Sequence, residues 1–282
     1  MAYIVAGYAV TEQQPGLGVV IVTYNSGLHL DRCLDSLGHH PDQDILVVDN
    51  GSSDTTQACL ATRSHVRQIG NQTNRGYSAA ANQGAAQLNR EFLCFLNPDC
   101  EAPPGFLPNA LSTLQQRPDE VLVPLALTGP RGRIAAKRPG YTRRRLIYDI
   151  VQGNWGHLPE TRMTATEVAR AEWYWPHGAC IFIRRELFQN LGGFDERYPM
   201  YMVDVDFGRR LHRAAPEIHC LEQELLHLEG GGSAISSIER LRLLNQGRIT
   251  YARQEYGAGF DALLRCLAWP GYLLRKSFKG AG

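Results

Sequence analysis

The chain has 282 residues, of which 44% are hydrophobic, so it can bury a sizeable core as one large α/β domain or two small ones. Its 29 Lys and Arg residues nearly balance 28 Asp and Glu residues, which argues against bulk binding of nucleic acid, and we expect no such partner. Neither a secretory signal nor a run of about 20 apolar residues is visible, and the seven cysteines form no C-x-x-C pair. These features predict a cytoplasmic protein with reduced thiols that touches a membrane, if at all, at the inner face of the plasma membrane.

Short apolar runs alternate with helical segments through the first hundred residues. Strands are expected at 17–22, 45–48, 66–69 and 92–96. Between them, Leu30, Cys33 and Leu34 recur at helical spacing, and the Ala-rich segment 76–88 predicts another helix. This alternation predicts an α/β fold, a Rossmann-like, mostly parallel sheet flanked by helices.

Polar residues follow three of these strands directly. They are Thr23, Tyr24 and Asn25 after the first, Asp49 and Asn50 after the second, and Asn97 and Asp99 after the fourth. Because ligands of such sheets bind beyond the carboxyl ends of the strands, we interpret these clusters as one binding crevice.

The later part of the chain is less regular. Segment 128–172 is rich in Arg, Gly and Pro, and we interpret it as an irregular insertion or lid on the acceptor side. Apolar order resumes at 179–183, a helix is expected to begin around Asp204, and a longer helix is expected at 237–256.

Six segments carry a family resemblance. They are VVIVTYNSG at 19–27, VVDNGSSDTT at 47–56, NRGYSAAANQG at 74–84, FLNPD at 95–99, GACIFIRRELF at 178–188 and GGFDERYPMYMVDVDFGRR at 192–210. In this order and spacing the chain resembles the family 2 glycosyltransferases with a GT-A fold, particularly their bacterial rhamnosyltransferase-like branch. The resemblance covers roughly residues 17 to 250 and implies a nucleotide-sugar-binding half at 17–126 and an acceptor-binding and catalytic half of the same domain at 127–256, followed by C-terminal helices. Residues 257–282 are interpreted from their own composition as a C-terminal basic amphipathic tail.

The resemblance also implies the reaction and its partners. The donor would be a nucleotide-diphospho-sugar, dTDP- or UDP-linked, with rhamnose as the first choice, and the transfer would invert the anomeric centre. The acceptor would be a cell-envelope glycan or a polyprenyl-linked glycan, and the cofactor would be Mg²⁺ or Mn²⁺. A catalytically silent nucleotide-sugar-binding module of the same fold is the alternative function, and the replacement of a family Glu by Val203 favours it.

By the same resemblance, the donor is bound by the polar strand ends. The base and ribose are assigned to Thr23, Tyr24, Asn25 and Asn97, and Asp49 accepts the hydrogen bond of the pyrimidine N–H. Asn74, Arg75 and Gly76 open the next helix, whose backbone N–H groups would meet ribose or phosphate. A simple turn at Asp49 and a solvated surface charge at Arg75 remain open.

The metal is assigned to Asp99 and His227. The family's D-x-D motif is Asn97-Pro98-Asp99 in this chain, so Asp99 supplies its remaining carboxylate, and His227 precedes a glycine-rich loop. A hard divalent cation would gather the diphosphate oxygens and stabilise the leaving group. The alternatives are a turn Asp after a strand and a buried core histidine.

The general base is assigned to Asp204, which aligns with the Asp of the family's Glu-Asp pair. The acceptor side is assigned to Trp175, His177, Gly178 and Asp206. Asp206 could instead cap the helix or pair with Arg209 or Arg210, and Trp175 could instead pack against a strand edge.

The tail combines apolar and basic residues, which suits an anionic membrane surface. A terminal helix packed on the body of the protein is the alternative. We expect Pro270 and Gly271 to interrupt the helix.

Overall fold

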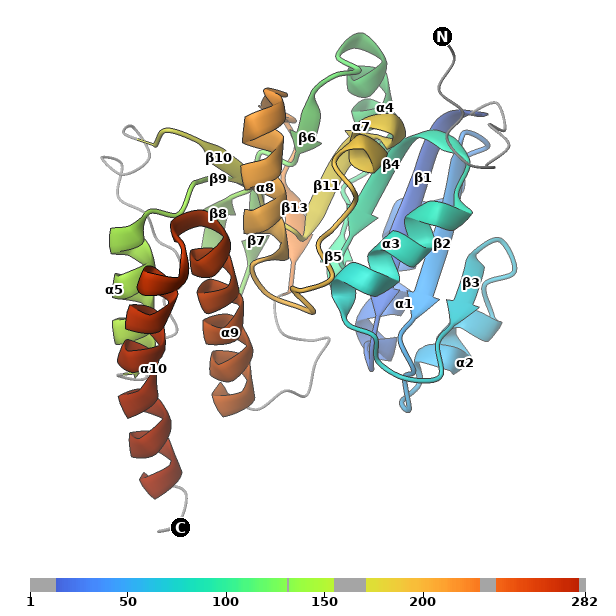
Figure 1. The fold of residues 1–282 in the computed structure, drawn as a ribbon. Helices are drawn as coiled ribbons and strands as arrows, with labels where there is room; N and C mark the ends of the chain where they lie inside the picture. The colour runs from blue at the N-terminus through green and yellow to red at the C-terminus, as the bar shows by residue number, and fades with distance from the viewer. Residues whose placement is uncertain (1–13, 131, 155–170, 229–236, 279–282) are drawn as a thin grey trace, which may run out of the picture.

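A computed structural model describes residues 14–130, 132–154, 171–228 and 237–278 (Figure 1). The strands are β1 (Gln14–Thr23), β2 (Gln43–Asp49), β3 (Arg67–Gly70), β4 (Arg90–Leu96), β5 (Cys100–Glu101), β6 (Val121–Val123), β7 (Ala126–Gly129), β8 (Gly132–Ala135), β9 (Lys137–Pro139), β10 (Tyr174–Pro176), β11 (Cys180–Arg184), β12 (Ile218–Cys220) and β13 (Leu225–His227). The helices are α1 (Gly27–Leu37), α2 (Thr56–Ala61), α3 (Tyr77–Gln87), α4 (Phe106–Gln116), α5 (Arg143–Asn154), α7 (Arg185–Asn190), α8 (Val203–Ala214), α9 (Ser237–Tyr256) and α10 (Ala258–Phe278).

The core is a seven-stranded sheet in the order β12-β6-β11-β4-β1-β2-β3. Its pairs are parallel except where β11 lies between β4 and β6. The apolar residues of β1, β2 and β4 are buried, as expected for parallel strands covered on both faces. The predicted α/β class with a mostly parallel sheet is therefore confirmed.

Helix α3 packs closely on β1 and β2, and Figure 1 shows it crossing this part of the sheet. Gly84 permits this close approach, because a Cβ there would lie 2.7 Å from a methyl group of Val20. The fit fixes the beginning of α3 near the carboxyl ends of the strands.

The prediction of an irregular insertion at 128–172 is wrong for its described part. Strands β7 and β8 form an antiparallel hairpin, β9 pairs with β10, and α5 is a regular helix. Strands of three or four residues are too short to show alternation, and α5 buries the charged residue Asp149 beside Leu146 and Ile150, which masks its helical pattern. Residues 155–170 lie outside the described part.

Helices α5, α9 and α10 pack together beside the sheet (Figure 1). Leu264 and Ala268 of α10 are buried, so the first half of the tail is a terminal helix packed on the body. The predicted interruption at Pro270 is wrong, because α10 continues to Phe278. A proline costs a helix one backbone hydrogen bond, and α10 accommodates it. Within the described residues no helix is both long and apolar enough to cross a bilayer, and the membrane contact stays a prediction.

Candidate active site

A cavity of about 390 Å³ opens beyond the carboxyl ends of β1 and β4. Many of the predicted site residues line it: Thr23, Tyr24, Asn74, Gly76, Asn97, Asp99, His177, Gly178, Asp204 and His227. The main chain of Asn97 donates a hydrogen bond to the carbonyl of Ala179, which ties the end of β4 to the segment before β11. Residues far apart in the sequence thus meet at the sheet edge that the strand pattern predicted.

Two predicted donor-binding residues are held in turns outside this cavity. Oδ1 of Asp49 accepts the backbone N–H of Ser52 at 3.1 Å, and Asp49 is only 3% exposed. Asn25 has a left-handed φ of 53°, and its Oδ1 accepts the N–H of Ser53 at 2.8 Å. The structure therefore shows the turn at Asp49, and leaves base recognition by Asp49 a prediction.

At the beginning of α3, the N–H groups of three consecutive residues already have partners within the chain, which counts against the predicted phosphate contact of Arg75 and Gly76. The N–H of Arg75 donates to Oδ1 of Asn50 and the N–H of Gly76 to Oδ1 of Asn74. The N–H of Tyr77 donates to the carbonyl of Pro199. The chain crosses here so closely that a Cβ on Gly76 would lie 2.8 Å from that carbonyl oxygen. The Arg75 side chain is exposed and lies outside the cavity lining.

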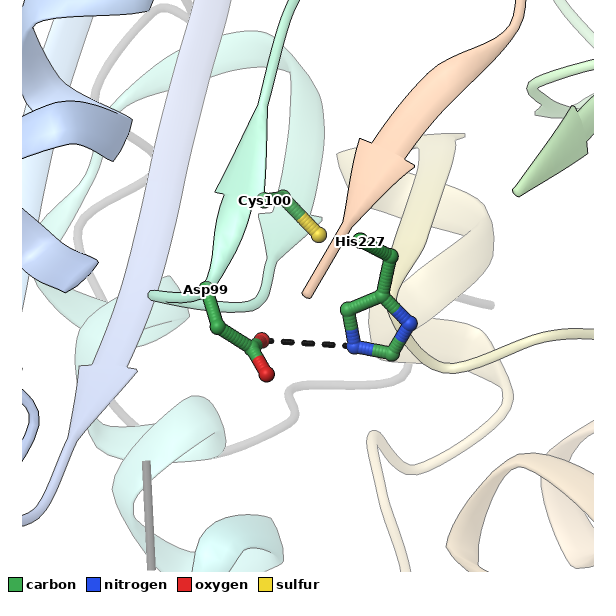
Figure 2. A group of neighbouring side chains, drawn as sticks. All are labelled: Asp99, Cys100 and His227. Carbon is green, nitrogen blue, oxygen red and sulfur yellow. Dashed lines mark ion pairs between the residues drawn. The ribbon is translucent and has the colours of Figure 1, made fainter. Parts of the chain in front are cut away.

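Asp99 and His227 both line the cavity, and their side chains point toward one another (Figure 2). Strand β13 pairs with β5 so that His227 lies opposite Cys100, which brings its Nε2 to 3.3 Å from Oδ1 of Asp99. Burial alone would raise the pKa of the Asp99 carboxyl, but the hydrogen bond and charge of His227 hold that pKa below its ordinary value. Asp99 is therefore kept ionised, the form in which a carboxylate binds a cation.

The donor atoms of Asp99, Cys100 and His227 lie within 4.8 Å of one another. Burial raises the pKa of the Cys100 thiol well above its ordinary value, and its Sγ lies 3.6 Å from the carbonyl of Ala179. A buried neutral thiol is a poor ligand for a hard cation, whereas a carboxylate with an imidazole suits Mn²⁺ and, less well, Mg²⁺. The pair Asp99 and His227 fits the implied metal, with the remaining positions left to phosphate oxygens and water.

Asp204 lies in the first turn of α8, and its carboxylate borders the cavity. Burial raises the pKa of this carboxyl above its ordinary value, against the backbone N–H groups of Gly178 and Val205, which donate to its two oxygens at 2.9 and 3.0 Å. The residue before the helix, Met202, has a left-handed φ of 66°, and Val203 is buried. The turn thus places a carboxyl group with a raised proton affinity at the cavity, which is what a general base requires.

Of the predicted acceptor-side residues, His177 and Gly178 reach the cavity and two do not. Trp175 is buried, and its Nε1 donates a hydrogen bond to the carbonyl of Pro139 in β9. It therefore packs against a neighbouring strand, which was the alternative to acceptor binding. Asp206 pairs with Arg210 at 2.7 Å, also as its alternative proposed. Burial, then the neighbouring His227 and Arg138, lower the pKa of His177 well below its ordinary value, so this imidazole is neutral.

The cavity is also lined by residues that the sequence did not single out, among them Tyr77, Met200, Tyr201, Met202 and Arg240. Tyr77 and the segment 200–202 belong to the family-like motifs, so a signal was present. Arg240 lies on α9, beyond the last of those motifs, and no local pattern marks it.

Comparison with known proteins places this geometry in context. A family model described as glycosyl transferase family 2 matches residues 18–192. The N-acetylglucosaminyl-diphospho-decaprenol L-rhamnosyltransferase of Mycobacterium tuberculosis is 32% identical over 269 residues, which cover 88% of each chain.

Two solved structures share the fold at low sequence identity. S. aureus TarS 1-349 in complex with UDP-GlcNAc has a TM-score of 0.56 at 19% identity, over 90% of this chain and 70% of that one. The mannosyltransferase PcManGT from Pyrobaculum calidifontis, in complex with GDP-Man and Mn²⁺, has a TM-score of 0.55 at 16% identity, over 96% and 77%. These likenesses confirm the expected GT-A fold.

Proposed function

The chain belongs to glycosyl transferase family 2, and from this premise we propose that it transfers a sugar, with inversion, from a nucleotide-diphospho-sugar to a lipid-linked glycan acceptor. One observation carries the proposal: the carboxylate of Asp204 and the pair Asp99 and His227 face the same cavity. Such a displacement needs a base for the acceptor hydroxyl and a metal ion that stabilises the leaving group, and Asp99 and His227 are a pair of ligands for that ion.

Asp99 and His227 would hold a divalent cation, which supplies charge stabilisation for the departing diphosphate. Thr23, Tyr24 and Asn74 line the same cavity and would orient the nucleoside portion of the donor. Thr23 is suited to this role because its buried hydroxyl has no hydrogen-bond partner among the described residues.

Asp204 acts as the general base in this proposal. The acceptor hydroxyl oxygen forms a bond to the anomeric carbon, its proton passes to the Asp204 carboxylate, and the bond from that carbon to the diphosphate oxygen breaks with its electron pair. The two N–H groups that hold Asp204 leave it little rotational freedom, so the carboxylate is positioned before the acceptor arrives.

The substrates follow from the mycobacterial relative. Its name specifies a rhamnosyl transfer to a decaprenyl-diphospho-N-acetylglucosamine, and it matches 88% of this chain. We propose the same sugar and the same class of acceptor here, rhamnose and a polyprenyl-diphospho-sugar, with the dTDP-linked donor that the sequence resemblance implies.

The test is an assay of dTDP release from dTDP-rhamnose, with UDP-sugars as alternative donors and a short-chain polyprenyl-diphospho-N-acetylglucosamine as acceptor. We expect acceptor-dependent release that needs Mn²⁺ or Mg²⁺. Metal-dependent nucleotide binding without transfer to any acceptor of a panel would instead support the silent binding module, which the buried Val203 favours. Absence of nucleotide binding would contradict both functions.

A further inference from the structure

We infer that Arg240 binds the diphosphate of the donor and balances the charge that forms on the leaving nucleotide. The inference rests on the proposed function and adds Arg240 to the residues that bind the donor. Arg240 lines the cavity from α9, a helix that none of the family-like segments reaches.

The packing of α9 explains how Arg240 reaches the site. Gly247 lies seven residues further along the helix, on the same face, because two turns of an α-helix take about seven residues. A Cβ on Gly247 would lie 2.9 Å from the carbonyl oxygen of Tyr201 and 3.0 Å from Cγ of Met202, and both of these residues line the cavity. The face of α9 that carries Arg240 is therefore pressed against the wall of the cavity.

Beside the divalent cation proposed at Asp99 and His227, no other element supplies the cavity with a positively charged side chain from the described residues. The cavity is lined by the carboxylates of Asp99 and Asp204, and Arg240 is the one Arg or Lys in its lining within the described part of the chain. Where α3 begins, the N–H groups of Arg75, Gly76 and Tyr77 are already bonded to Asn50, Asn74 and Pro199. The Arg75 side chain is exposed outside the cavity.

Arg240 would stabilise the negative charge that forms during the transfer. Breaking the bond between the anomeric carbon and the diphosphate leaves one more negative charge on the nucleotide, in a space that already holds two carboxylates. A guanidinium can donate two parallel hydrogen bonds to phosphate oxygens and keeps its charge at every working pH.

The side chain of Arg240 is also available for this role. Its neighbours on α9, Glu239 and Arg242, form an ion pair at 2.8 Å with each other. Across the residues that the structure describes, no hydrogen bond or ion pair is found for Arg240. The helix thus offers a matched pair of arginines, one at the cavity and one already satisfied on the surface.

The experiment compares Arg240→Gln, Arg240→Lys and Arg242→Gln with the wild type by calorimetric titration. The probes are UDP, dTDP and the corresponding monophosphates, each with Mn²⁺ and with EDTA. Arg240→Gln is expected to raise the Kd of the preferred diphosphate by about tenfold to a hundredfold, as for loss of a charged hydrogen bond. The monophosphate should lose less, Arg240→Lys should recover part of the affinity, and Arg242→Gln should match the wild type. Equal melting temperatures show that the variants are folded.

The outcomes separate the two proposals. If the wild type binds neither diphosphate, the proposed function fails and the inference fails with it. If the wild type binds and Arg240→Gln binds equally well, the inference alone is overturned. Because the proposed acceptor also carries a diphosphate, KM is measured for both substrates. A rise confined to the acceptor KM would overturn the assignment to the donor.

Discussion

Two regions surround the cavity, and their polar side chains have different roles. In the turns after β1 and β2, polar side chains bond to neighbouring backbone, as Asn25 does to Ser53 and Asp49 to Ser52. In the segments from the later half of the chain, Asp204, His227 and Arg240 present their charged or ligating groups to the cavity itself. The first region fixes the shape of the site, and the second, together with Asp99, provides its reactive groups.

This contrast predicts that substitutions in the second region reduce turnover more than they reduce stability. The largest effect is expected for Asp204→Asn, which keeps an oxygen for the N–H of Gly178, loses the acceptor for the N–H of Val205 and cannot take a proton. We expect turnover to fall by about a thousandfold, the size of a general-base contribution, with nucleotide Kd unchanged. Turnover is measured as acceptor-dependent nucleotide release, and Kd by calorimetry.

The matched control is Asp206→Asn, two residues further along α8. Asp206 lies outside the cavity lining and pairs with Arg210, so this variant should lose about 2 kcal/mol of stability and little turnover. Comparable losses of turnover in the two variants would contradict the assignment of the base.

The pH profile sharpens the same prediction. Because burial raises the pKa of Asp204, wild-type turnover should rise with pH to a midpoint above that of an ordinary carboxyl, as the base ionises. A carboxyl whose folded pKa is raised stabilises the fold fully below its unfolded pKa, and this contribution is lost as pH rises through the folded pKa. The free energy of unfolding of Asp204→Asn, relative to wild type, should therefore improve as pH rises above the ordinary pKa of a carboxyl and through the raised pKa of Asp204.

Substitution of a proposed metal ligand should give the next largest effect. Asp99→Asn removes the charged ligand, and we expect the Mn²⁺-dependent affinity for nucleotide diphosphate to fall by about tenfold to a hundredfold. The affinity in EDTA should not change. Cys100→Ala, which removes the third donor atom of the group, should retain the metal dependence. Loss of metal dependence in Cys100→Ala would show that the thiol is a ligand.

Gly247→Ala tests whether the packing of α9 against Tyr201 and Met202 affects both stability and turnover. The added methyl group would meet Tyr201 and Met202 at contact distances of 2.9 and 3.0 Å, so we expect a loss of about 1–3 kcal/mol in stability. Because Met202 begins the turn that holds Asp204, turnover should fall severalfold as well. Chemical denaturation and the release assay measure the two effects.

Gly259→Ala is the control for that substitution. Gly259 lies in the first turn of α10 with no atom within 4 Å of an added Cβ, so alanine should raise stability by up to about 1 kcal/mol. If Gly247→Ala were equally stabilising, the close packing of α9 on the Tyr201 turn would be excluded.

The same contrast separates what could be predicted from what could not. The apolar runs of β1, β2 and β4 predicted the sheet and the edge where the site lies, because continuous burial leaves a signal in the sequence. The role of Asn25 could not be predicted, since a polar residue after a strand serves a turn or a ligand equally well. The position of Arg240 at the cavity could not be predicted, because it depends on how α9 packs, and no local sequence pattern indicates that packing.

The smallest effect, and the closest test of the first region, is expected for Asp49→Asn. Asparagine keeps the Oδ1 that accepts the Ser52 N–H, so stability should change by less than about 1 kcal/mol. If the other carboxylate oxygen accepts the pyrimidine N–H, the new NH₂ group would oppose that donor, and the Kd for UDP or dTDP should rise by up to about tenfold. Calorimetric titration with uridine and with UDP measures this, and the two ligands should lose affinity equally, because the change affects only the base. An unchanged Kd would mean that Asp49 serves the turn alone, and that the shape of the first region, not its charge, selects the nucleotide.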